Sequence, residues 1–401
     1  MKIEILLSLL KGKKSKRGNY WLFNSFYGEY SDSPKVLSEL LHEKRPDIDI
    51  VWMLRDDVTE VPDYIHRVSI NAKDVETIRH SAAVLVDNIY GENGLFVKKG
   101  LVQRNVAKLL IWLRKARGQK IYTTWHGIPL KCLGRDEIES DYTDFICNDI
   151  TMFVNSAYEE HIMRHVTFDK VKIHKLGMPR NDNFFYPYNR ELKRIAAMER
   201  LSISANKHVL LYAPTFRRSK GIITKENLLN SGINQLEQIN ISLLLQTLKN
   251  KTGDEWVFVC RFHSQVSGAV DWEQIENEYH GNVINGNVII DLADLLASTD
   301  ILITDASSCM FDFMLTGRPC FLFFPDIDIY SRMEQGLYMS VEDLPFPLAE
   351  DSKQLMSLIE TFNKNEYKTR VNSLIEKWGC IDDGKSGERI LNFILRDQGI
   401  I

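Results

Sequence analysis

Residues 19–56 read "NYWLFNSFYGEYSDSPKVLSELLHEKRPDIDIVWMLRD" and decide the fold of the first half of the chain. "YWLFNSF" is typical of a strand, and "SPKVLSELLHEKRP" predicts a helix with Ser33 at its cap and Pro34 at its first position. "DIDIVWMLRD" predicts a second strand. Residues 75–88 then predict a helix that leads into a buried strand at 83–86. This alternation predicts a parallel sheet with helices on its faces.

The second half of the chain repeats the alternation. A helix is expected at residues 234–249, and a helical segment at 355–379 that returns to cover the first domain. Strands are expected at "HVLLYAPTFR" (208–217), "EWVFVCRFH" (255–263), "NVII" (287–290), "DILITD" (300–305) and "PCFLFF" (319–324). A chain of 401 residues exceeds what one core normally holds. We therefore expect an α/β protein with domains at 19–195 and 196–375, and a C-terminal helix at 376–401 that packs toward the first.

Composition excludes several classes of protein. The formal net charge of −4 gives no overall basic field for gripping nucleic acid. The six cysteines are scattered, without C-x-x-C spacing or a secretory signal, which predicts reduced thiols in a cytosolic protein. No Walker motif or G-x-G-x-x-G is present, which argues against a P-loop NTPase or an ordinary nicotinamide enzyme. His161 and His165 stand four residues apart without a third ligand, so we expect no bound metal.

Two stretches raise the question of a membrane. Residues 1–18 place leucines and isoleucines at helical spacing before a cluster of lysine and arginine, which fits a peripheral contact with the anionic inner leaflet. A solvated tail or a helix packed on the protein is the alternative. Residues 95–120 carry eight basic residues and no acidic one, and a solvated amphipathic helix is slightly favoured there over a second membrane-facing surface.

Side chains suited to binding an anion or to proton transfer follow the predicted strands. Doubly wound sheets bind their ligands at these carboxyl ends of the strands. "TTWHGIPLK" (123–131) puts His126 after a strand of the first half. In the second half, the cations and helix-capping residues suit a phosphate; they are Arg217, Arg261, His263, Asp305, Ser307 and Ser308. "DDGKSGER" (382–389) opens the last helix and predicts a second phosphate cradle from Lys385, Ser386 and Arg389.

Taken together, these motifs resemble the CDP-glycerol glycerophosphotransferase family, the teichoic acid primases and polymerases of bacterial cell walls and capsules. The matching pieces run in the family's order from about residue 19 to 390; they are "NSFYGEYSDSPK", "TTWHGIPLKCLG", "KLGMPRND", "YAPTFR", "RFH", "TDASSCMFDF" with "RPCFLFFPDIDIY", and "DDGKSGER". The resemblance implies a GT-B architecture of two Rossmann-like domains facing a cleft, an acceptor domain followed by a nucleotide-donor domain.

The resemblance also implies a reaction and its residues. A polyol phosphate passes from a CDP-polyol donor, most simply CDP-glycerol, to a hydroxyl of a polyprenyl-linked or polymer acceptor, and CMP leaves without a cofactor. His126 is the implied base, and His263 is a second implied catalytic residue that stabilises the charge on the pyrophosphate. The phosphate-binding residues above hold the donor. The implied acceptor cleft comprises Trp125, Gly127, Pro129, Lys131, Arg180 and Asp182.

The sequence departs from the family's pattern in two places. Ala306 replaces an aromatic residue, and Phe262 with Ser264 replaces the usual neighbours of the second histidine. These changes leave glycerol and ribitol donors open, as well as the acceptor. A GT-B glycosyltransferase that uses a nucleotide sugar and a membrane-associated binding protein without activity are the competing functions.

Overall fold

The structure is a computed structural model, and it describes residues 18–89, 95–98, 118–137, 142–146, 150–167, 171–215, 236–268, 270–328, 330 and 336–401. Residues 1–17, most of the basic stretch 95–120 and Arg217 therefore lie outside the described residues.

The chain divides into two compact units. Unit 1 comprises residues 1–126, 133–182 and 378–401, and unit 2 comprises 127–132 and 183–377. The boundary thus falls before residue 195, because α7 (Pro187–Arg200) belongs to the second unit. Its Arg194 donates to the carbonyl of Ser298 and pairs with Asp300 at 3.1 Å.

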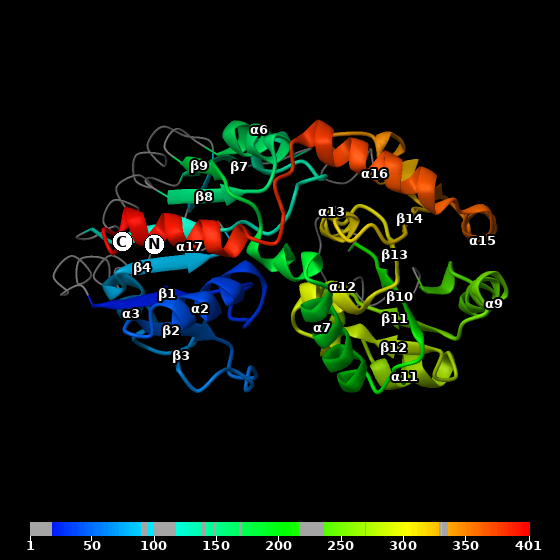
Figure 1. Ribbon diagram of the computed structural model, residues 1–401, viewed down its shortest axis with the longest axis horizontal. Helices are drawn as coiled ribbons and strands as arrows, with labels where there is room; N and C mark the ends of the chain where they lie inside the picture. Colours follow the sequence, from blue (N-terminus) through cyan, green and yellow to red (C-terminus); the bar gives the residue numbers. More distant parts are fainter. Residues whose placement is uncertain are drawn as a thin grey trace. The chain divides into compact units, whose positions relative to one another are not determined.

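Unit 1 is built on a parallel seven-stranded sheet in the order β3-β2-β1-β4-β6-β8-β9 (Figure 1). The strands are β1 (Tyr20–Phe23), β2 (Asp49–Leu54), β3 (Ile65–Ser69), β4 (Val84–Asp87), β6 (Lys120–Thr123), β8 (Ile150–Val154) and β9 (Lys172–Lys175). Its helices are α2 (Asp32–Lys44), α3 (Val75–Ser81) and α6 (Ala157–Val166), and β5 (Leu95–Lys98) pairs with β7 (Tyr142–Ile146) as a separate antiparallel ribbon. The strand order reverses between β1 and β4, which are neighbours in the sheet. The strands after β1 are added toward one edge, and those after β4 toward the other.

Unit 2 repeats this topology in a parallel six-stranded sheet, ordered β12-β11-β10-β13-β14-β15. The strands are β10 (His208–Ala213), β11 (Trp256–Cys260), β12 (Val283–Asn285), β13 (Ile301–Thr304), β14 (Cys320–Phe323) and β15 (Leu348–Ala349). The helices are α9 (Ile241–Thr252), α10 (Ser264–Ser267), α11 (Trp272–Glu278), α12 (Leu292–Ser298), α13 (Cys309–Met314), α15 (Ser352–Thr361) and α16 (Lys364–Trp378). Here the reversal lies between β10 and β13. The expected α/β fold with two parallel sheets is confirmed.

The last helix, α17 (Ser386–Asp397), completes the core of unit 1 (Figure 1). Its apolar face buries Ile390, Leu391, Ile394 and Leu395 in the same cluster as Trp21 and Trp52 from β1 and β2. Beyond it, the amide of Gln398 donates to the Tyr122 hydroxyl, which donates to Asp397 at 2.6 Å. Unit 1 is therefore assembled from both ends of the described chain.

The structure corrects several predicted elements. α2 is capped by Ser31 rather than Ser33, because the Ser31 carbonyl and the Asp32 carboxylate already accept the first N–H groups of the helix. The strand expected at 287–290 lies at 283–285 instead, since Asn285 caps the 3-10 turn that follows it. The helix expected at 234–249 runs from Ile241 to Thr252 instead, because Asn240 caps its N-terminus. β3, β8 and β9 were not predicted.

None of the helices in the described part of the chain has the length and apolar run needed to cross a bilayer.

Candidate functional site

Both sheets bring polar side chains together where the strand order reverses. In unit 1 the segments after β1, β4 and β6, three neighbouring strands, carry Phe26, Asn88 and His126. In unit 2 the segments after β10 and β13 carry Thr215 and Asp305. Crevices at the carboxyl ends of strands, at such reversal points, are where doubly wound folds bind ligands. Each unit therefore presents one candidate site.

His126 is half-buried, and its ring is held by a single defined hydrogen bond. Nδ1 lies 2.9 Å from the carbonyl oxygen of Asn88. Because a carbonyl can only accept, Nδ1 carries the proton, and in the neutral ring Nε2 keeps its lone pair. Phe26 meets the ring edge-on at 5.9 Å between centroids, and Trp125 lies 4.1 Å away. The ring is thus fixed in the tautomer that a general base needs.

The loop that contacts His126 is held in a strained conformation by Asn88. Asn88 is fully buried; its side chain accepts from the Phe26 N–H at 3.1 Å and donates to the Ser25 hydroxyl at 3.0 Å. Phe26 and Tyr27 have φ of 38° and 58°, values that favour glycine. Trp125 on the other side has φ of 54°. Strained backbone of this kind persists only where the surroundings enforce it, and it gathers at functional sites.

Electrostatics keep the ring neutral. Burial lowers the pKa of His126, and the Arg180 guanidinium lowers it further, while the hydrogen bond to Asn88 and the Asp32 carboxylate oppose them. The lowered pKa keeps Nε2 unprotonated at neutral pH, as base catalysis requires.

Arg180 and Asp32 form a buried ion pair. Their Nη1 and Oδ2 atoms are 2.7 Å apart, and each side chain is 7% exposed. The other carboxylate oxygen accepts from the Ser33 N–H at 2.5 Å, and the Arg180 N–H donates to the Ser33 hydroxyl at 3.3 Å. Arg180 was expected to line an acceptor cleft; its guanidinium is engaged inside unit 1.

In unit 2, Asp305 fixes the ends of two neighbouring strands. Its buried carboxylate accepts from the Thr215 N–H at 2.8 Å and from the Ala306 N–H at 2.7 Å. Ser307 and Ser308 follow it, both half-buried, and the Ser307 hydroxyl accepts from the Cys309 N–H. α13 begins there and is only six residues long. The structure brings these three predicted residues together.

Arg261 and His263, the two basic residues after β11, differ in the contacts that they make. Arg261 donates from its guanidinium to the carbonyls of Gly286, Ile289 and Ile290, so this side chain holds the segment after β12. His263 is exposed, and its carbonyl accepts from the N–H groups that open α10.

The segment 382–389 lies in unit 1, and its polar groups are engaged there. The Asp182 carboxylate accepts from the N–H groups of Ser386 and Gly387 at 3.0 and 2.7 Å, so it occupies the helix N-terminus where a phosphate was expected. Arg389 donates to the carbonyls of Leu176 and Ile381, and Ser386 is buried. Of the three residues predicted for the cradle, Lys385 is the exposed one. This motif and Asp182 are therefore better assigned to fastening α17 than to holding a ligand.

The remaining predicted acceptor residues straddle the division of the chain. Trp125 belongs to unit 1, whereas Gly127, Pro129 and Lys131 belong to unit 2. Gly127 and Pro129 are buried, Gly127 has φ of 138°, and the Lys131 ammonium lies 5.9 Å from the centre of the Tyr330 ring. The boundary thus falls immediately after His126.

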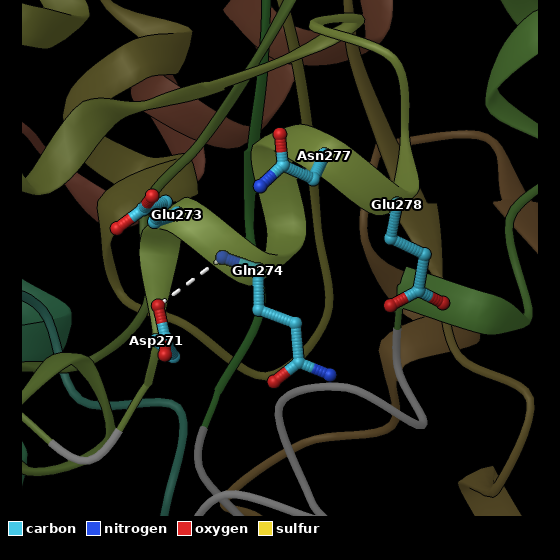
Figure 2. A pocket seen from close by; sticks show the side chains of 5 residues that line it. All are labelled: Asp271, Glu273, Gln274, Asn277 and Glu278. Atoms are coloured by element: carbon cyan, nitrogen blue, oxygen red, sulfur yellow. Dashed lines mark hydrogen bonds between the residues drawn. The ribbon is translucent and has the colours of Figure 1, made fainter.

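A separate surface pocket lies on α11 (Figure 2). It is lined by Asp271, Glu273, Gln274, Asn277 and Glu278. Because its charged groups are all carboxylates, this pocket is unsuited to a phosphate. Among the described residues, no group of three or more His, Cys, Asp or Glu side chains is placed to hold a metal ion.

Sequence comparison identifies the family. The family model described as CDP-glycerol:poly(glycerophosphate) glycerophosphotransferase matches residues 6–396. The chain belongs to this family.

Curated relatives carry teichoic acid names. The chain is 27% identical over 400 residues to the teichoic acid poly(glycerol phosphate) polymerase of Staphylococcus epidermidis, covering 94% of this chain and 50% of that protein. It is 26% identical over 420 residues to the teichoic acid glycerol-phosphate transferase of Staphylococcus aureus, covering 98% and 95%. The chain therefore spans about half the length of the first relative and almost all of the second.

Solved structures of the wall teichoic acid polymerase TagF share the fold. One, a variant with asparagine in place of a histidine and soaked with CDPG, superposes with a TM-score of 0.76 at 26% identity, covering 98% of this chain and 93% of that one. The expected GT-B fold class is thereby confirmed.

Three residues around His126 were not predicted as site residues: Ser25, Asp32 and Asn88. Asn88 follows the strand predicted at 83–86 by two residues, so its position was a usable signal. Ser25 and Asp32 are brought near the site only by the fold.

Proposed function

We propose that this chain transfers glycerol phosphate from CDP-glycerol to a hydroxyl of a lipid-linked or polymer acceptor and releases CMP. Membership of the family supports the donor class. The observation that carries the chemistry is His126, a half-buried ring with Nδ1 bonded to a carbonyl and a lowered pKa.

In the proposed reaction the acceptor oxygen attacks the phosphorus next to the glycerol. A new P–O bond forms as the bond from that phosphorus to the bridging oxygen breaks, and the electron pair leaves with CMP. Nε2 of His126 takes the hydroxyl proton, which is within the capacity of a neutral imidazole near pH 7. Phosphoryl transfer of this kind gains mainly from positioning and electrostatics.

The donor-holding role is proposed for residues of unit 2. Asp305 fixes the loop, and the hydroxyls of Ser307 and Ser308 with His263 supply hydrogen bonds to the pyrophosphate. Arg217 stays a proposed phosphate contact from the sequence alone. Arg261 acts indirectly, because it holds the backbone next to His263.

The test is acceptor-dependent CMP release from CDP-glycerol and CDP-ribitol, for the wild type and His126→Asn. We expect release from CDP-glycerol that His126→Asn abolishes while its thermal stability stays near that of the wild type. His165→Asn is a matched control, since this histidine is exposed and pairs with Asp136 on the surface of unit 1. Full activity in His126→Asn would refute the assignment of the base.

CDP-ribitol is included for a specific reason. The teichoic acid poly(ribitol-phosphate) polymerase of Bacillus spizizenii is 30% identical to this chain over 228 residues, covering 55% of this chain and 33% of that protein. Release of CMP from CDP-ribitol alone would keep the reaction and change the polyol. Release from neither donor would favour a nucleotide sugar or a binding protein without activity.

We propose that the protein binds peripherally to the inner leaflet of the cell membrane through residues 1–18. The basic cluster after the leucines supports it. Deletion of residues 1–17 should weaken sedimentation with vesicles that contain anionic lipid and leave transfer to a short soluble acceptor unchanged. Undiminished vesicle binding would refute the role of this segment.

A further inference from the structure

We propose that the buried Asp32–Arg180 pair is a positioning pair for His126, acting on the ring through its charge and through the loop between β1 and α2. The inference rests on the proposed role of His126 as the base. Neither side chain is assigned a contact with substrate.

Three hydrogen bonds lead from the ring to Ser31, the chain neighbour of Asp32. Nδ1 of His126 donates to the carbonyl of Asn88, and the Asn88 amide donates to the Ser25 hydroxyl. That hydroxyl lies 3.1 Å from the hydroxyl of Ser31, the residue before Asp32. Loss of the pair would loosen Ser31, at the far end of this series of hydrogen bonds, and with it the loop that carries Phe26.

The pair is an unusual way to hold a loop. Burying two charges costs desolvation energy that a well-packed apolar pair would avoid, so stability alone is weak ground for it. Asp32 also has φ of 63°, a left-handed conformation that disfavours a residue with a side chain. Both features are explained if the two charges serve the neighbouring ring.

The two charges act on His126 in opposite directions. Arg180 disfavours the imidazolium and Asp32 favours it, with Arg180 the larger influence, while burial of the ring is larger than either. Other charged groups on the segments that carry the pair and its contacts include Asp182, two residues after Arg180, and Lys35 on α2. Asp87 lies at the end of β4, and Glu29 pairs with Arg55 at 3.1 Å. Arg180 therefore adds to the lowering of the His126 pKa by burial, and Asp32 opposes it.

The experiment is the pH dependence of CMP release in full-length Arg180→Gln, Asp32→Asn and Arg180→Lys variants. We expect the acidic limb to move to higher pH in Arg180→Gln and to lower pH in Asp32→Asn, whose amide still accepts from the Ser33 N–H. Arg180→Lys keeps the charge, so the acidic limb of its pH–activity curve should stay at the wild-type pH. If the acidic limbs of Arg180→Gln and Asp32→Asn both coincide with that of the wild type, the proposal is overturned.

Two further measurements separate the possible failures. Asp300→Asn removes a partly buried pair with Arg194 in unit 2, so it reports a loss of stability without an effect on His126. NMR titration of the His126 ring, assigned by its disappearance in His126→Asn, gives the same shifts without turnover. Shifts in opposite directions without CMP release would support the pair while refuting the proposed function. If Arg180→Gln does not fold, an unmoved titration in Asp32→Asn still overturns the proposal.

Discussion

The two histidines that follow strands are held in contrasting ways. His126 is half-buried, bonded through Nδ1 to Asn88 and touched by strained aromatic residues. His263 is exposed, and the arginine two residues before it bonds to three backbone carbonyls. The first environment fixes a tautomer and a charge state, whereas the second leaves the ring accessible. The two histidines follow strands at different places in the two sheet orders, β6 in unit 1 and β11 in unit 2. The first environment suits proton transfer, and the second suits contact with an anion.

The largest expected effect separates the two histidines directly. His126→Asn should lower kcat by roughly 10³-fold, because a general base contributes about 10²–10⁴-fold. His263→Asn should raise KM for the donor and lower kcat by about 10²-fold at most, as for the loss of one group that stabilises transition-state charge. Steady-state CMP release measures both. Equal losses in kcat with unchanged KM would end the distinction.

Arg261→Met should destabilise unit 2 by about 3 kcal/mol, because a charged donor to three carbonyls is lost. Urea denaturation measures this loss. Arg200→Met is the control, an exposed side chain that donates to the carbonyl of Val288, with an expected loss within about 0.5 kcal/mol. Normal stability with weakened donor binding would instead assign Arg261 to the phosphate.

The fastening of α17 predicts a pH dependence of stability. Burial raises the pKa of Asp182 from 3.8 to about 6, against the lowering effect of the N–H donors of Gly387 and Ser386. The folded state then binds the proton more tightly than the unfolded state, so stability from this group is full below pH 4 and is lost as the pH rises through 6. Relative to Asp182→Asn, the wild type should lose about 2 kcal/mol across that range. Parallel stability curves for the two proteins would contradict the raised pKa.

The smallest expected effect concerns the loop beside His126. Asn88→Ala removes the acceptor of the Phe26 N–H and the donor to Ser25, while the backbone carbonyl that holds His126 remains. We expect about a tenfold fall in kcat, about 1.4 kcal/mol, with little change in KM. Asn189→Ala, at an exposed asparagine of α7, is the control. An unchanged kcat would show that the loop does not position the ring.

The sequence predicted the strand-end position of His126 and of Asp305 because both follow buried apolar runs. It could not predict Asn88 as a partner, since the residues it holds lie 62 and 63 positions earlier in the chain. For the same reason the sequence could not show that Asp182, 204 residues away, accepts from the backbone N–H groups of the cradle predicted at 382–389. The misplaced strand at 287–290 has a local cause, because nearly the same letters occur at 282–285 and only the cap of Asn285 decides between them.

The placement of α17 also bears on how the protein is synthesised. Glu388 of this helix pairs with Lys44 of α2 across 344 residues, and the apolar face between them completes the core around β1 and β2. At a translation rate of about 5–20 residues per second, the ribosome needs roughly 17–70 s to cover that distance. Once β9 has been made, the strands of the first sheet are present but their covering helix is not. The nascent chain then exposes apolar surface that chaperones would recognise. Unit 2, whose residues 127–132 and 183–377 are all made before α17, can complete its fold first.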